Sequence, residues 1–122
     1  MENYTSNLFN YQRRKTIAVK VGNIEIGGEN PIRVQSMANT DTNDTCASVE
    51  QAIRIEQAGG ELVRFTAQGV KEANNLEVIH SQLRSRGAKV PLVADIHFNP
   101  KAAEVAALYV EKVRINPGNF VD

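Results

Sequence analysis

The sequence has 122 residues, which is enough for one ordinary domain and too few for two. Hydrophobic residues make up 42% and charged residues 23% of it, a mixture typical of a soluble globular protein rather than a disordered, fibrous or membrane protein. Fourteen Lys and Arg balance fourteen Asp and Glu, so no overall field attracts the chain to nucleic acid or to a membrane surface. Any site for an anion must therefore be local.

We expect neither a secretory signal nor a membrane span in this sequence. Residues 1–15 form a polar lead without the apolar core of a secretory signal, and no later run approaches the roughly 20 apolar residues of a membrane span. Cys46 is the single cysteine, which excludes an intramolecular disulfide and suits a reducing compartment. These features predict a cytoplasmic protein that does not contact a membrane.

A β-hairpin is predicted directly after the lead, over residues 16–28. Apolar residues alternate along residues 16–21, Gly22 and Asn23 supply a turn, and residues 24–26 form the returning strand before two further glycines.

Strand-like and helix-like segments alternate from Pro31 onward. The strand candidates start 29, 29 and 22 residues apart, intervals that suit βα units. Helices are predicted between them from apolar residues at helical spacing, with Gly59 and Gly87 near two helix ends and Asn99 as an N-cap. The strands are residues 32–37, 61–67, 90–97 and 112–116, and the first helix covers about 45–58. This alternation predicts an α/β fold with a parallel sheet.

Polar residues inside these strands fall on one side of the predicted sheet. The apolar sides can receive the helices, which leaves the polar sides facing a shared interior near the carboxyl ends of the strands, where barrel enzymes hold their chemistry. The first strand separates polar from apolar residues less clearly, with Arg33 and Gln35 on one side and Ile32 and Val34 on the other. The polar set in the other strands is Arg64, Thr66, Asp95, His97, Arg114 and Asn116.

The strand count predicts half of a (β/α)8 barrel. A complete barrel needs about 250 residues, and the four strands predicted here are half of its number. We therefore expect residues 31–122 to form the first four βα units of an incomplete domain, preceded by the hairpin and the lead. The outer strands of such a half-barrel present unpaired edges.

Arg64 and Arg114 are the first candidates for ligand binding. We expect them on the interior face of neighbouring strands, where two guanidinium groups can clamp phosphate oxygens bidentately. The alternative is that both pair with Asp95 and neutralise the barrel interior, because some charge networks are purely structural. The two interpretations are compatible, and the first predicts a phosphorylated small molecule as the ligand.

Asp95 and His97 are the candidate catalytic residues. Strand spacing puts this carboxylate and this imidazole on one face, a pair suited to orienting a substrate hydroxyl, to proton transfer or to metal binding. A catalytic zinc normally has three protein ligands, and no third is apparent because His80 falls on a helix face expected to lie against the sheet. No metal site is therefore predicted.

Asn116 begins a turn over residues 116–119, directly after the last strand. Its Asn, Pro and Gly residues expose backbone amides that can form an anion-binding nest, or that simply make an ordinary βα loop. Cys46 is interpreted as a small structural residue, because no base lies beside it in the sequence.

Four runs of residues resemble, in order and spacing, the N-terminal barrel of the 4-hydroxy-3-methylbut-2-enyl diphosphate synthase family. The resemblance covers roughly residue 11 to the end of the chain. Residues 68–73 and 119–122 look more like the long, insert-containing type of plants and Bacteroidetes than the short bacterial type. The runs are VQSM at 34–37, VRFT at 63–66, PLVADIHF at 91–98 and RINPGN at 114–119.

This resemblance implies a function. Members of the family reductively open 2-C-methyl-D-erythritol 2,4-cyclodiphosphate to a linear allylic diphosphate in the non-mevalonate pathway of isoprenoid biosynthesis, with electrons from ferredoxin or flavodoxin. By the resemblance, Arg64 and Arg114 hold the diphosphate, while Asp95, His97 and Asn116 contact the polyol part or order the site. The hairpin would close the bottom of the barrel.

The resemblance also implies a 4Fe-4S cluster, bound by cysteines and one glutamate of a separate C-terminal domain. Such a cluster usually takes three or four thiolates, and Cys46 is the single cysteine here. We therefore expect no cofactor on this chain, and no activity from the chain alone.

Two other interpretations stay open from the sequence. A half-barrel can act as a binding module without catalysis, pairing its strand edges with a second copy as a homo-oligomer. A different phosphate-binding barrel enzyme, related to pterin synthases, is the other, although the third and fourth runs fit it poorly.

Overall fold

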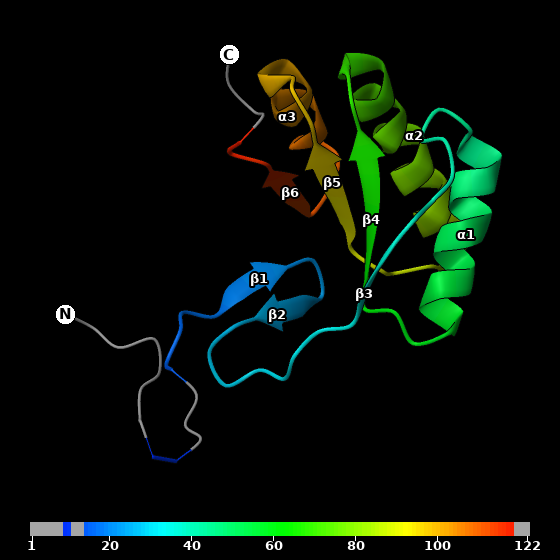
Figure 1. Cartoon of the computed structure of the whole chain (residues 1–122). Coiled ribbons are helices and arrows are strands. Elements are labelled where there is room, and N and C mark those ends of the chain that lie inside the picture. The colour runs from blue at the N-terminus through cyan, green and yellow to red at the C-terminus, as the bar shows by residue number, and fades with distance from the viewer. Residues whose placement is uncertain (1–8, 11–13, 119–122) are drawn as a thin grey trace.

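The computed structural model describes residues 9–10 and 14–118. Within these residues a short hairpin precedes four strands that alternate with three helices, as Figure 1 shows. In chain order the elements are β1 (Val19–Val21), β2 (Ile24–Ile26), β3 (Gln35–Met37), α1 (Thr45–Gln57), β4 (Leu62–Ala67), α2 (Val70–Ser85), β5 (Leu92–Ile96), α3 (Pro100–Ala106) and β6 (Lys112–Ile115). The predicted α/β fold class is confirmed.

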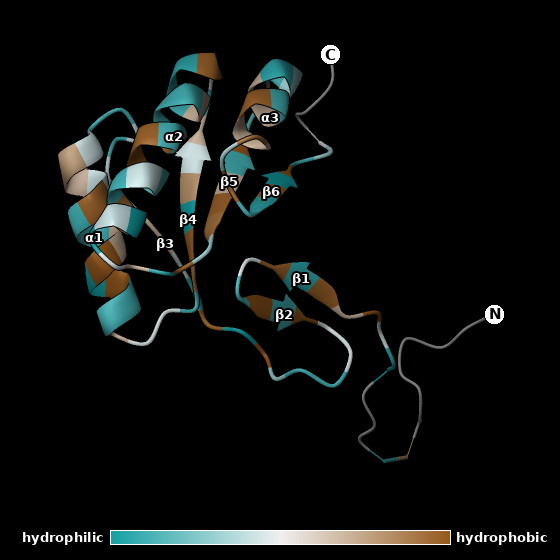
Figure 2. Cartoon of the chain, turned by 180° about the vertical axis from the view of Figure 1, so that it is seen from behind, coloured by the Kyte–Doolittle hydropathy of each residue, from teal (hydrophilic) through white to brown (hydrophobic). Residues whose placement is uncertain are grey.

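The parallel sheet has the strand order β3-β4-β5-β6, so each strand pairs with the next one along the chain. The three described helices lie on one face of this sheet (Figure 1). On that face Phe65 and Leu92 of the strands pack with Leu76 and Ile79 of α2, and all four side chains are fully buried. Burying each of these residues stabilises the fold by roughly 1.5–3 kcal/mol. The helices carry both hydrophobic and hydrophilic residues in Figure 2, as expected for segments with one face in the core.

The predicted Asn99 cap and the predicted glycines lie at the helix ends, and Asp44 provides a further cap that was not predicted. The Asp44 carboxylate accepts a hydrogen bond from the Ala47 N–H at 3.1 Å, and the Asn99 side chain accepts one from Lys101 N–H at 3.1 Å, so each caps the first turn of its helix. Gly59 and Gly87 follow α1 and α2 with φ of +103° and +85°. Glycine adopts this left-handed conformation without the steric penalty of a side chain, which explains where both helices end.

The hairpin lies at the amino ends of the parallel strands (Figure 1). Val21 of β1 is buried together with Leu62 of β4 and Val93 of β5, and Ile24 and Ile26 pack against this small cluster. Leu62 and Val93 belong to the sheet face that the helices leave open. The hairpin therefore covers the lower part of the open face.

The first parallel strand is shorter than predicted, because β3 spans Gln35–Met37 and not residues 32–37. The Arg33 guanidinium donates to the Glu25 carbonyl at 2.9 Å and to Glu61 Oε2 at 2.9 Å. The Val34 N–H donates to the other Glu61 oxygen at 3.1 Å. The Val34 carbonyl still accepts hydrogen bonds from the Glu61 and Leu62 N–H groups at 2.7 and 3.2 Å, but the Val34 N–H bonds to a side chain. The regular strand begins at Gln35, so the predicted strand over residues 32–34 is wrong.

Candidate anion-binding site at the carboxyl ends of the strands

The open face of the sheet carries the predicted polar residues in register. Thr66 of β4 pairs with Asp95 of β5, and Asp95 pairs with Arg114 of β6, so these three lie in one row across the sheet. Arg64 lies two positions earlier on β4, in the row that includes Met37 of β3. Residues of one row in a parallel sheet point to the same side. The sidedness predicted for these strands is confirmed.

Asp95 is the centre of the cluster and its side chain is 3% exposed. Arg114 Nη1 donates to Asp95 Oδ1 at 2.8 Å, and His97 Nε2 lies 3.2 Å from Asp95 Oδ2. Arg64 Nε approaches the same Oδ2 at 3.8 Å. The two arginines were expected on neighbouring strands, which is wrong, because β5 separates β4 from β6 and brings Asp95 between them.

The Asp95 carboxyl stays ionised because of its partners. Burial raises its pKa, but the hydrogen bonds from Arg114 and His97 and the charges of the same two groups outweigh burial, and the pKa is lowered from its ordinary value. The cluster thus holds one buried carboxylate beside two guanidinium groups and an imidazole.

Arg64 is less fully paired than Arg114. Its Nε is buried and, among the described residues, has no hydrogen-bond partner. Its Nη2 donates to Met37 Sδ at 3.3 Å, and a thioether is a weak, uncharged acceptor. A buried donor without an acceptor is destabilising, and an anion on this face would remove that penalty. Two guanidinium groups against one carboxylate leave the cluster with positive charge available for a ligand.

Asn116 takes part in the turn and not in the charged cluster. Its Oδ1 accepts a hydrogen bond from the Gly118 N–H at 3.0 Å, which fixes the start of the loop after β6. The predicted anion nest extends to Asn119, which lies outside the described residues.

Two features at this end of the sheet gave no clear signal in the sequence. The buried Thr42 hydroxyl donates to the Thr66 carbonyl at 2.6 Å, which ties the loop before α1 to the end of β4. Phe98 follows β5 with a φ of +65° and is 68% exposed, and its ring centroid lies 6.2 Å from that of His97. Neither a threonine nor a phenylalanine marks such a position by its type.

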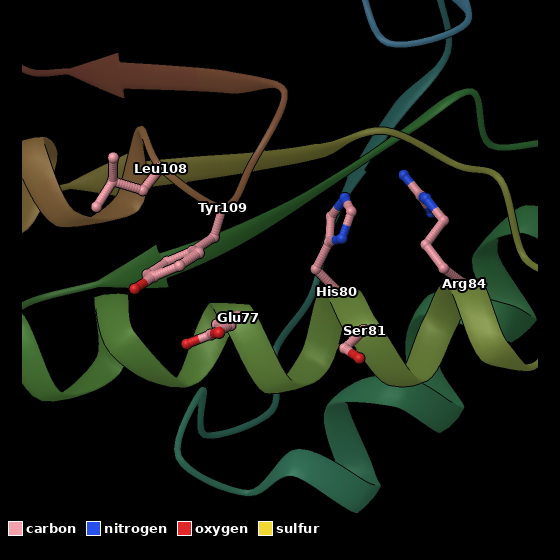
Figure 3. A pocket seen from close by; sticks show the side chains of 6 residues that line it. All are labelled: Glu77, His80, Ser81, Arg84, Leu108 and Tyr109. Atoms are coloured by element: carbon pink, nitrogen blue, oxygen red, sulfur yellow. The ribbon is translucent and has the colours of Figure 1, made fainter.

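A second charged cluster lies on the helix side of the sheet, around Glu111. His80 and Arg84 extend from the same side of α2 toward the strands (Figure 3). His80 Nε2 and Arg84 Nη2 each lie 2.7 Å from Glu111 Oε1, and the Leu92 N–H donates to Oε2 at 2.8 Å. His80 and Arg84 also line an open hollow of about 340 Å³ with Tyr109. This hollow is remote in the fold from Asp95 and contains none of the predicted site residues.

The residues of this chain do not fit an iron-sulfur cluster. Cys46 is exposed on α1, and the described ranges contain no group of three or more His, Cys, Asp or Glu side chains placed to hold a metal ion. Ligands for such a cluster would have to come from elsewhere. Separately, no helix in the described part of the chain has the length and apolar character needed to span a membrane.

The fold and its polar face define part of an α/β barrel with a positively charged site at the carboxyl ends of its strands. The chain belongs to the GcpE TIM-barrel domain family, which it matches over residues 16–122. The resemblance inferred from the four sequence runs is therefore confirmed, and so is the assignment of the sheet to part of a (β/α)8 barrel.

Curated relatives carry the name 4-hydroxy-3-methylbut-2-en-1-yl diphosphate synthase (flavodoxin). The chain is 67% identical to the protein of Bacteroides thetaiotaomicron over 115 residues, which are 94% of this chain and 19% of the relative. It is 64% identical to that of Porphyromonas gingivalis over 115 residues, 94% of this chain and 20% of the relative. It is 56% identical to that of Leptospira interrogans over 119 residues, 98% and 18% respectively. The chain thus spans about a fifth of their length.

Proposed function

We propose that this chain forms the first four βα units of the barrel of a 4-hydroxy-3-methylbut-2-en-1-yl diphosphate synthase. In this role it contributes part of the binding site for 2-C-methyl-D-erythritol 2,4-cyclodiphosphate, which the complete enzyme opens reductively in isoprenoid biosynthesis. Support comes from the family match over residues 16–122 and from 67% identity to a relative that carries this name. The relatives' length, of which the chain covers 19%, favours the longer, insert-containing type.

The proposed substrate role rests above all on Arg64. Arg64 Nε is buried, lies 3.8 Å from Asp95 Oδ2 and has no hydrogen-bond acceptor among the described residues, and Arg114 contacts the same carboxylate. A diphosphate oxygen at this place would gain a charge-assisted hydrogen bond. In this proposal Arg64 and Arg114 hold the diphosphate, and Asp95 keeps the two guanidinium groups in position. His97 and Asn116 contact the polyol part or order the site, and Asp95 and His97 are the candidates for proton transfer.

The proposed organisation has three parts. Residues 1–15 are a polar lead, residues 16–28 cap the bottom of the barrel as a hairpin, and residues 31–122 are an incomplete barrel domain. The redox chemistry would be supplied by a 4Fe-4S cluster held outside this chain, with flavodoxin or ferredoxin as the electron donor. The compartment we propose is the cytoplasm.

An exchange experiment tests this function. In the Bacteroides thetaiotaomicron synthase, the 115 matching residues are replaced by those of this chain to give an exchange protein. We expect the exchange protein to turn over the cyclic diphosphate with flavodoxin at a rate within about tenfold of its parent, a change of about 1.4 kcal/mol in the barrier. A folded exchange protein that retains its cluster but shows no turnover would contradict the proposal.

The 122-residue chain alone should not turn over, even after reconstitution with iron and sulfide. Turnover by the purified chain would contradict the proposed division of the site between this chain and other segments. The reading frame beyond codon 122 gives an independent check, because four further βα units and a Cys-Pro-x-Cys segment are expected there.

A self-associating half-barrel without catalysis is the second candidate. It is favoured by apolar residues exposed at the open edge of the sheet, with Val34 57% and Met37 44% exposed. A second copy could cover this edge. Light scattering on the 122-residue chain would give a dimer or larger assembly under this candidate, while a well-behaved monomer would contradict it.

A further inference from the structure

Phe98 combines two features that the packing of the fold does not explain. Its φ of +65° lies in the left-handed region, which is unfavourable for a bulky side chain. The other positive-φ residues in the described part of the chain are all glycines. The Phe98 side chain is also 68% exposed, so its ring gains little from burial in return for the strained backbone.

The location of Phe98 suggests what the strain provides. The residue directly follows His97, whose Nε2 lies 3.2 Å from Asp95 Oδ2, and the two rings lie with their centroids 6.2 Å apart at an angle of 44°. Strained residues collect at binding sites, where the gain from a ligand offsets the conformational penalty. An exposed aromatic ring beside a cationic cluster offers an apolar surface next to the place where an anion binds.

We propose that Phe98 is a specificity-determining residue that forms an apolar rim on the anion-binding face. Arg64 and Arg114 would attract any phosphate-containing anion, whereas the Phe98 ring would contact only an anion that also carries a carbon skeleton. The site thereby prefers an organic diphosphate to inorganic pyrophosphate. This inference rests on the proposed function, because it takes the face around Asp95 as the binding site.

Substitutions at Phe98 separate the ring from the backbone. Phe98→Ala removes the ring and keeps a side chain in the left-handed conformation, while Phe98→Gly removes the ring and relieves the backbone. Phe98→Leu keeps apolar bulk. Dissociation constants for the cyclic diphosphate and for inorganic pyrophosphate would be measured by calorimetry on the exchange protein and on each variant.

We expect the alanine and glycine variants to bind the cyclic diphosphate about five- to tenfold more weakly, as loss of an apolar contact implies, and to bind pyrophosphate within about twofold of the unchanged exchange protein. The leucine variant should lose about twofold or less for either ligand. Equal weakening for both ligands would overturn the inference, because Phe98 would then act through the fold or through His97. Unchanged affinity for both would also overturn it.

The same measurements separate this inference from the proposed function. If pyrophosphate binds, and binds more weakly after Arg64→Gln, the proposed anion-binding face is supported independently of the result at Phe98. If the unchanged exchange protein turns over but its Phe98 variants keep their preference for the organic ligand, only the role of Phe98 fails. If neither ligand binds the folded exchange protein, both proposals fail together.

Discussion

The clusters around Glu111 and Asp95 are built from the same residue types and differ in how completely they are paired. Glu111 meets His80, Arg84 and a backbone N–H within 2.8 Å. Arg84 also donates to the carbonyls of Ala88 and Val90 at 3.1 Å. Around Asp95, by contrast, a buried Arg64 nitrogen lacks an acceptor among the described residues. The first arrangement joins α2 and β5 to the segment before β6, and in the proposed function the second binds a ligand.

Removing the Glu111 charge should produce the largest effect, and on stability alone. Glu111→Gln leaves His80 and Arg84 without their carboxylate, so we expect the free energy of unfolding to fall by about 2–4 kcal/mol. Urea unfolding of the 122-residue chain measures this, with exposed Glu104→Gln on α3 as the control. A loss no larger than that of the control would show that the Glu111 cluster does not join the elements.

Arg64→Gln should affect ligand binding more than stability, in contrast to Glu111→Gln. We expect pyrophosphate affinity of the exchange protein to fall about 10- to 100-fold, since a hydrogen bond to a charged group contributes about 1.5–3 kcal/mol. Stability should fall less than after Glu111→Gln, because Arg64 Nε makes no hydrogen bond within the described residues and lies 3.8 Å from Asp95. Arg54→Gln, at an exposed position of α1, is the matched control in the calorimetric titration. Equal affinity in the two variants would contradict an anion site at Arg64.

Acidification should weaken both clusters. The pKa of Glu111 is lowered from its ordinary value of 4.5 and that of Asp95 from 3.8; burial raises both, and their hydrogen bonds and cationic neighbours outweigh it. A carboxyl with a depressed pKa in the folded state stabilises the protein above its unfolded pKa, and this stability is lost as the pH falls through the folded value.

Urea unfolding at about pH 6 and about pH 4 tests the Glu111 part of this effect. The unchanged chain should lose more stability over this interval than Glu111→Gln, because the variant has no carboxyl to protonate at that position. Identical losses would assign the acid sensitivity to other groups.

The smallest effect is expected at Asn99, which caps α3, the helix between the two clusters in the chain. Asn99→Ala removes the side chain that caps Lys101 and Ala102 and should lower stability by about 1 kcal/mol. Asn99→Asp retains a capping oxygen and should lose much less. Thermal unfolding of both variants measures the difference, and an equal loss would mean that capping is not the cause.

The sequence predicted the Asp95 cluster well, because strand alternation and the order of a parallel sheet determine which side chains share a face. It did not reveal Glu111 as the centre of the other cluster. Glu111 meets its partners across 19, 27 and 31 residues, and no local pattern encodes such contacts. His80 was expected against the sheet, and its hydrogen bond to Glu111 was not foreseen.

Two positions were harder to predict, the segment before β3 at the edge of the sheet and Phe98 after the end of β5. Residues 32–34 look like a strand by composition, but the Arg33 guanidinium and the Val34 N–H hydrogen-bond to the Glu61 side chain, and the regular strand begins only at Gln35. The left-handed backbone at Phe98 is equally invisible, since glycine and asparagine are the residue types that signal this conformation. At Arg33 and Val34 a contact distant in the sequence overrides the local preference.

The buried contact of Val21 with Leu62 and Val93 also divides the open face of the sheet into two parts. Val93 and Asp95 are separated by two positions on one strand, so the apolar floor lies about 7 Å below the carboxylate. Along the strands the open face thus changes from apolar side chains under the hairpin to charged side chains toward the carboxyl ends.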